Sequence, residues 1–152
     1  MVNKEPDRLY IRKSDRKDYD RLLEKDSPLV GKENKDLFMM ALITGFHEGT
    51  RVKLDKIEGF FLLYHLNDEE NSIIKAIAVA EEGDLNILLD KKKVYSIAEE
   101  YATSGIKLLR NKVFSGEYGS YIKKLESELI DEFERIKDKR GVNLWRGIKR
   151  YS

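Results

Sequence analysis

The sequence predicts a mainly α-helical fold: a single compact domain of about five helices with at most a few short strands. In several stretches, apolar residues recur at spacings of three and four, as on the buried face of an amphipathic helix. Capping residues precede these stretches and glycines follow them. Only two prolines occur in 152 residues, and no Ser/Gly-rich linker divides the chain. We therefore expect one domain over 1–152, ending in a basic tail at 140–152.

The N-terminal part is predicted to form a short strand and then a helix. Residues 9–11 read as a strand or an extended segment. Ser14 or Asp15 can cap a helix that runs to about Lys25. Pro28 then favours a turn, because the residue before a proline is pushed out of the helical region.

The second predicted helix lies over residues 36–46, with Asn34 as its cap. Its residues are apolar all round, which is typical of a helix at the buried centre of a domain. Gly45 and Gly49 both offer a helix end.

Residues 57–66 allow two interpretations. The apolar run 60–64 suits a buried strand, and it also suits a short helix capped at Asp55. We favour the helix. The next helix is signalled more clearly, because Asn67 and Glu70 have the spacing of a reciprocal capping box.

Apolar residues at helical spacing follow to about Glu81, and Gly83 can end this helix. Residues 85–89 are a short link with some strand character. Asp90 can cap a long helix that keeps an apolar stripe to about Phe114. Gly105 inside it indicates a kink or close packing by a neighbouring helix. A last amphipathic helix is expected over 120–139.

Composition excludes several classes of protein. The 29 Lys and Arg against 28 Asp and Glu leave a net charge of +1, which excludes a uniformly basic binder and a strongly acidic mimic. The absence of Cys excludes disulfides and thiolate metal sites. A high charged fraction without Cys or Gln is typical of proteins from hot habitats, although an AT-rich genome has a similar effect. No apolar window reaches membrane-spanning length, so we expect a cytoplasmic protein without membrane contact.

The charges are segregated along the chain. Residues 66–90 hold seven acids and one base, whereas residues 135–152 hold seven bases and one acid. Three lysines also open the helix at 91, against its dipole. Bases with interleaved aromatics can hold a phosphate backbone and stack on nucleotides. The candidate nucleic-acid-binding residues are therefore Lys91, Lys92, Lys93, Lys107, Arg110, Arg140, Trp145, Arg146, Lys149 and Arg150.

Each of these features also has a purely structural interpretation. The lysines can be a solvated cluster, and the tail can pack Trp145 onto the domain while its bases pair with the acidic segment. The acidic pairs at 69–70, 81–82 and 99–100 point about 100° apart on a helix, so we expect solvated faces rather than a site.

Catalytic motifs are absent from the sequence. His47 and His65 have no metal-ligand spacing, and neither a nucleophile elbow nor a phosphate-binding glycine loop occurs. We expect no cofactor, no metal and no catalytic residue. An enzyme would need a site assembled from scattered residues around His47, Glu48 and Arg51.

Two segments resemble a known family. Residues 35–46 with 49–51 resemble the opening motif of the DNA phosphorothioation-associated protein 4 family. Residues 76–78, and then 100–106 with Leu109, resemble its second motif. The resemblance implies a small accessory protein encoded beside a DNA sulfur-modification or restriction system, and it transfers no catalytic residue.

Three hypotheses follow for the function. The first is a non-enzymatic accessory protein that contacts DNA or the protein components of such a system. The second is a homo-oligomeric structural protein in which acidic and basic segments pair between chains. The third is an enzyme with a site near His47.

Overall fold

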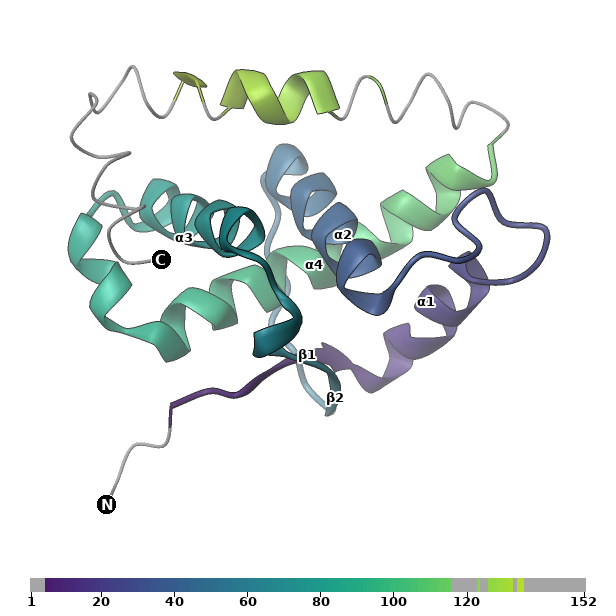
Figure 1. The fold of residues 1–152 in the computed structure, drawn as a ribbon, viewed down its shortest axis with the longest axis horizontal. Helices are drawn as coiled ribbons and strands as arrows, with labels where there is room; N and C mark the ends of the chain where they lie inside the picture. Colours follow the sequence, from purple (N-terminus) through teal and green to yellow (C-terminus); the bar gives the residue numbers. More distant parts are fainter. Residues whose placement is uncertain (1–4, 116–122, 124–125, 133, 136–152) are drawn as a thin grey trace.

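The computed structural model describes residues 5–115, 123, 126–132 and 134–135. The predicted mainly α-helical single domain is confirmed (Figure 1). None of the helices in this described part is long and apolar enough to cross a membrane. In chain order, the strands and α-helices are β1 (Arg8–Arg12), α1 (Arg16–Leu22), α2 (Asn34–Glu48), β2 (Ile57–Leu62), α3 (Asp68–Glu82) and α4 (Lys91–Val113).

Helix α2 lies across the long helix α4 at the centre of the domain, and α1 and α3 lie on either side (Figure 1). The apolar residues of α2 are buried on several sides, among them Leu37, Phe38 and Leu42. This confirms the predicted buried centre. Burial of side chains around a helix is the main source of its stability when it has no polar face.

The ends of α2 differ slightly from the prediction. Its N-cap is Glu33, whose side chain forms a reciprocal capping box with Asp36. The helix ends at Gly49, which has a left-handed φ of 78°. Gly45 lies inside the helix and has a packing role that is described below.

The favoured helix is wrong for residues 57–62, which form the alternative strand, and Leu63–His65 form a short 3-10 helix. β2 pairs with β1 in an antiparallel two-stranded sheet, with Leu9 opposite Phe61. The pairing turns Phe60 inward, where its ring contacts the ring of Tyr19 at 4.5 Å between centroids. A short apolar run has no local signal for its partner strand, so long-range pairing decided its conformation.

Three shorter predictions have mixed outcomes. Helix α1 ends at Leu22 rather than near Lys25, because the chain turns there to bury Ser27 and Leu29. The capping box of Asn67 and the stop at Gly83 are confirmed for α3. Residues 85–89 form a 3-10 helix rather than a strand.

The cap of α4 at Asp90 is confirmed, since its carboxylate accepts a hydrogen bond from the Lys93 amide at 3.1 Å. The predicted last helix is observed where the structure describes it, over 126–132. Residues 123, 134 and 135 are also helical, whereas the rest of 120–139 and the tail 140–152 lie outside the described residues.

Candidate nucleic-acid interface and the Arg51 cluster

The three lysines at the start of α4 form one exposed cluster. Lys91 lies 3.6 Å from the Glu5 carboxylate, and Lys93 lies 3.1 Å from that of Glu82. Lys92 is exposed and makes no ion pair within the described part of the chain. Lys91 also lies close enough to Lys75 on α3 to add to the burial that lowers the Lys75 pKa. Lys92 is the one lysine of the three without a carboxylate partner among the described residues.

Lys107 and Arg110 do not extend this cluster. They lie about 24 Å further along α4, at a rise of about 1.5 Å per residue. Arg110 bonds the carboxylate of Asp18 at 2.7 Å, and Lys107 lies 3.3 Å from the same side chain. The other predicted nucleic-acid contacts lie outside the described residues: Arg140, Trp145, Arg146, Lys149 and Arg150.

The residues proposed for an enzymatic site are not bonded to one another in the described part of the chain. The Nε2 atom of His47 lies 3.1 Å from a carboxylate oxygen of Glu128. Within the described residues, His47 forms no hydrogen bond or ion pair with Glu48 or Arg51. The same part of the chain has no group of three His, Cys, Asp or Glu that could hold a metal ion.

Two glycines bring α2 and α4 into direct backbone contact. A Cβ atom on Gly105 would lie 1.8 Å from the carbonyl oxygen of Ala41. A Cβ atom on Gly45 would lie 1.9 Å from the carbonyl oxygen of Tyr101. Both distances are far shorter than any van der Waals contact, so only glycine fits at either position. The close packing predicted from Gly105 is confirmed.

Arg51, in the loop after α2, bonds side chains of both α3 and α4. Its guanidinium bonds Glu81 of α3 at 2.7 Å and Glu100 of α4 at 3.1 Å. The Tyr101 hydroxyl donates to Glu81, and the Ser96 hydroxyl donates to Glu100 at 3.2 Å. We call these five residues the Arg51 cluster. It fixes the loop after α2 against α3 and α4.

The electrostatics of the Arg51 cluster depend on its cation. Burial alone favours the neutral form of Glu81, but hydrogen bonds from Tyr101 and Arg51 outweigh it and lower the Glu81 pKa. The guanidinium also lies over the Tyr101 ring, 5.9 Å from its centroid. Its donors are directed at two carboxylates of the same domain, so the chemical effect of this arrangement is to hold three elements together.

Sequence reasoning missed the Arg51 cluster. Adjacent acids were expected to diverge, and they do, because Glu81 reaches Arg51 while Glu82 reaches Lys93. The expected solvated face is wrong for Glu99 and Glu100, which are partly buried. The available signal was the position of Arg51, two residues after a helix-ending glycine. Its partners, on two other helices, could not be found from spacing alone.

Glu99 lies beneath the sheet and receives a backbone bond from it. Its carboxylate accepts a hydrogen bond from the Tyr10 amide at 2.7 Å. Burial raises the pKa of Glu99 to about 7, and the neighbouring Glu100 adds to this effect. The Tyr10 amide favours the ionised carboxylate, but burial outweighs it and resists the loss of the Glu99 proton.

Replacing Glu99 with Gln is expected to reduce the fall in stability between pH 5 and pH 8. The folded state holds the Glu99 proton more tightly than the unfolded state, so the stability of the wild type decreases as pH rises through this interval. The difference from the variant should be about 2 kcal/mol, measured by urea unfolding at both pH values. The exposed Glu69→Gln change is the control. Identical pH profiles for wild type and Glu99→Gln would contradict the assignment.

The acidic segment 66–90 is partly neutralised inside the domain. Glu70 bonds Lys35 at 3.0 Å, and Glu81 and Glu82 pair with Arg51 and Lys93. Fewer of its carboxylates are therefore free for a partner than the sequence suggests.

Comparison with known proteins gives one family. The model of the family described as DNA sulphur modification system-associated protein 4 matches residues 14–146. No curated protein and no solved structure matches the chain. The match covers most of the sequence and includes both segments that carry the resemblance described above.

Proposed function

The chain belongs to the DNA sulphur modification system-associated protein 4 family, and from this membership we propose that it is a non-enzymatic accessory component of such a system. The family is associated with DNA sulfur modification systems. The proposed component acts by contacting nucleic acid and the proteins of the system. Its surface, rather than a reaction centre, carries the function.

The residues of the two segments that carry the family resemblance serve the packing of the fold, and this supports the proposal. Gly45 and Gly105 serve the crossing of α2 and α4, and Arg51 and Glu100 bind each other. Polar groups that are engaged in this way stabilise a fold. A rigid scaffold that presents surfaces to partners needs such an arrangement.

Charge supports DNA as one of the partners. The lysine cluster at 91–93 is exposed at the start of α4. The sequence 135–152 adds seven bases and only one acid. Exposed cations of this kind contact phosphates and release counterions. We propose that both segments contribute to DNA binding.

Changing Lys91, Lys92 and Lys93 together to Ala is expected to weaken binding to a short labelled DNA duplex. Each phosphate contact that is lost should reduce the slope of log affinity against log salt by about 0.9. Fluorescence anisotropy over a salt series measures both quantities. The matched control, which also removes three exposed cations, is the change of Lys25, Lys32 and Lys123 to Ala.

The outcomes of this experiment separate the hypotheses. A wild-type protein that does not bind duplex or single strands at low salt contradicts the DNA proposal. Sedimentation of the same samples tests the alternative. A species that dissociates to monomers when salt is added indicates pairing of acidic and basic segments between chains.

A further inference from the structure

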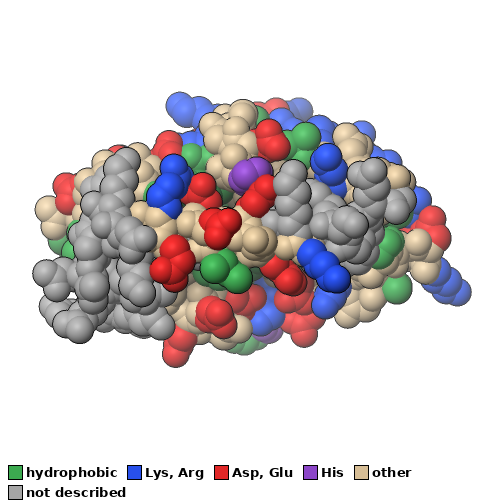
Figure 2. Space-filling view, turned by 90° about the horizontal axis from the view of Figure 1, so that it is seen from above, with side chains coloured by type: hydrophobic (Ala, Val, Ile, Leu, Met, Phe, Trp, Pro, Cys, Tyr) green, Lys and Arg blue, Asp and Glu red, His purple; other side chains and the backbone are tan. Residues whose placement is uncertain are grey.

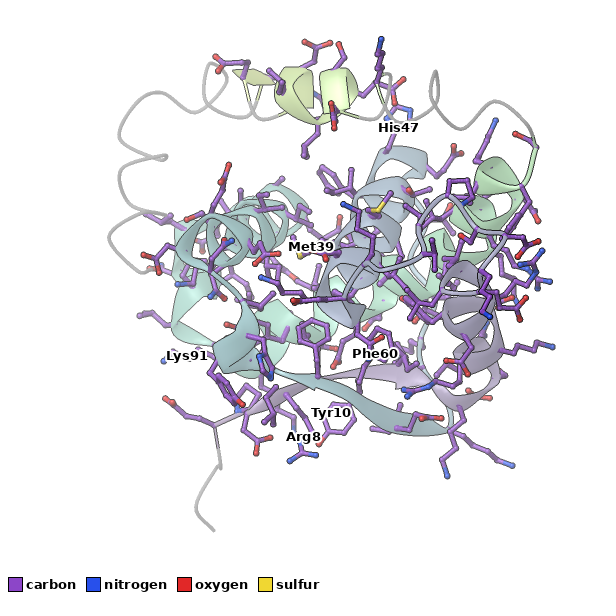
Figure 3. The ribbon with its side chains drawn as sticks, turned by 45° about the vertical axis from the view of Figure 1, so that its right-hand side comes forward. Arg8, Tyr10, Met39, His47, Phe60 and Lys91 are labelled. Atoms are coloured by element: carbon purple, nitrogen blue, oxygen red, sulfur yellow. The ribbon has the colours of Figure 1, made fainter. Side chains whose placement is uncertain are left out.

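Strand β1 connects the two basic ends of α4 across the surface. The alternation of the strand buries Leu9 and Ile11 and turns Arg8, Tyr10 and Arg12 outward. Figure 3 shows Arg8, Tyr10 and Lys91 on the side of the molecule opposite His47. None of the β1 residues is among the nucleic-acid contacts predicted from sequence.

Ion pairs at both ends of α4 involve residues in β1 or close to it in the sequence. At one end, Lys91 of α4 lies 3.6 Å from Glu5, three residues before Arg8. At the other end, Arg12 forms two bonds with Asp15, at 3.0 and 3.2 Å, and Lys107 of α4 lies 3.9 Å from the same carboxylate. The cations therefore follow one continuous path over β1.

Two buried carboxylates support the far end of this path. Asp15 and Asp18 are each 1% exposed, yet the cations that bind them reach solvent, with the Lys107 side chain 56% and the Arg110 side chain 41% exposed. Charged groups bound to a buried carboxylate on one side keep donors on the other side. The carboxylates thus hold long cationic side chains in place before any partner arrives, which lowers the entropy lost on binding.

The path holds more cations than carboxylates that pair with them. Lys13 directly follows β1, Lys17 lies on α1 between Asp15 and Asp18 in the sequence, and Lys92 lies beside Lys91; all three are exposed and make no ion pair within the described residues. We call the whole path the β1 stripe. Its eight cations exceed the four carboxylates that pair with them, Glu5, Asp7, Asp15 and Asp18; the cations are Arg8, Arg12, Lys13, Lys17, Lys91, Lys92, Lys107 and Arg110.

The opposite face has the reverse character. Figure 2 views the domain from the side on which residues 126–132 lie, and Asp and Glu side chains are prominent over the middle of that face. The carboxylates drawn there repel a polyanion, whereas the cations of the β1 stripe attract one. The distribution orients a DNA partner toward the sheet.

We propose that the β1 stripe is a single contact surface for the phosphate backbone of duplex DNA. This inference rests on the proposed function and names the surface through which it acts. From Lys92 to Arg110, α4 extends over about 27 Å, which is comparable to one turn of the duplex at about 34 Å. The two ends of the stripe therefore reach phosphates separated by most of a helical turn, and β1 lies over the groove between them.

Single substitutions along the stripe test this proposal. Lys92→Ala, Arg8→Ala and Lys17→Ala remove one cation from each end and from the middle. None of these residues bonds the buried carboxylates, so the fold should be retained, and circular dichroism melting checks this. With a labelled duplex, each change should reduce the salt slope by about 0.9, and the triple variant should show the sum. Lys32→Ala, which removes an exposed cation away from the stripe, should leave the slope unchanged.

Each result has a distinct meaning. Equal reductions at all three positions support the stripe. A reduction at Lys92 alone, with Arg8→Ala and Lys17→Ala equal to wild type, overturns the stripe and leaves the proposed DNA contact in place. Absence of binding by the wild type at low salt overturns both.

Discussion

Replacing Gly105 with Ala is expected to destabilise the domain by about 3 kcal/mol or more. The added Cβ would lie 1.8 Å from the Ala41 carbonyl oxygen and 2.6 Å from the Gly45 amide nitrogen. Both obstacles are main-chain atoms of a packed helix, so relief requires α2 and α4 to move apart. The same change in an open helix would stabilise by about 1 kcal/mol. Urea unfolding followed by circular dichroism measures the difference, including its sign.

Gly49→Ala is the matched control for this prediction. No heavy atom lies within 4 Å of a Cβ at Gly49, so only its left-handed φ of 78° opposes the change. We expect a cost of about 1 kcal/mol from that backbone conformation. If Gly105→Ala is as stable as the wild type, the backbone contact between α2 and α4 is not present in solution.

The consequences of this crossing extend to the loop after α2. The Ser104 hydroxyl donates to the Thr50 carbonyl, and the Val52 amide donates to the Glu100 carbonyl at 3.2 Å. These bonds form only when α2 lies close to α4. The position of Arg51 therefore depends on two glycines that are far from each other in the sequence.

Local signals predicted the long helices of this domain well. Asn67 and Gly83 bound α3, Asp90 caps α4, and both helices carry a clear apolar period. Each of these features concerns neighbours in the sequence, so it is visible in one chain. The assignment failed at 57–62, where the strand depends on β1 nearly fifty residues earlier.

The candidate surfaces were only partly predictable for the same reason. Lys91, Lys92 and Lys93 stand together in the sequence, and they were identified from it. Arg8 and Arg12 were not, because their relation to the cluster arises from the packing of β1 against α4. The burial of Asp15 and Asp18 was equally invisible, since an acidic residue is normally expected on the surface.

Changing Arg51 to Met is expected to destabilise the domain by about 2 kcal/mol at neutral pH. The methionine retains much of the aliphatic stem but removes the cation between Glu81 and Glu100, whose side chains are 29% and 15% exposed. Two partly buried carboxylates then face each other without compensation. Chemical denaturation at pH 7 measures the loss.

A charge-neutral rescue distinguishes this mechanism from a loss of packing. Adding Glu81→Gln and Glu100→Gln to Arg51→Met removes the repulsion, so a large part of the lost stability should return.

The pH dependence of stability in the wild type provides a second check. Because Tyr101 and Arg51 lower the Glu81 pKa, the stability that they supply is present at neutral pH and is lost as pH falls below the ordinary glutamate range. Arg51→Met should therefore lose less stability on acidification than the wild type. If the triple variant is no more stable than Arg51→Met, the stem of Arg51 rather than its charge holds the loop.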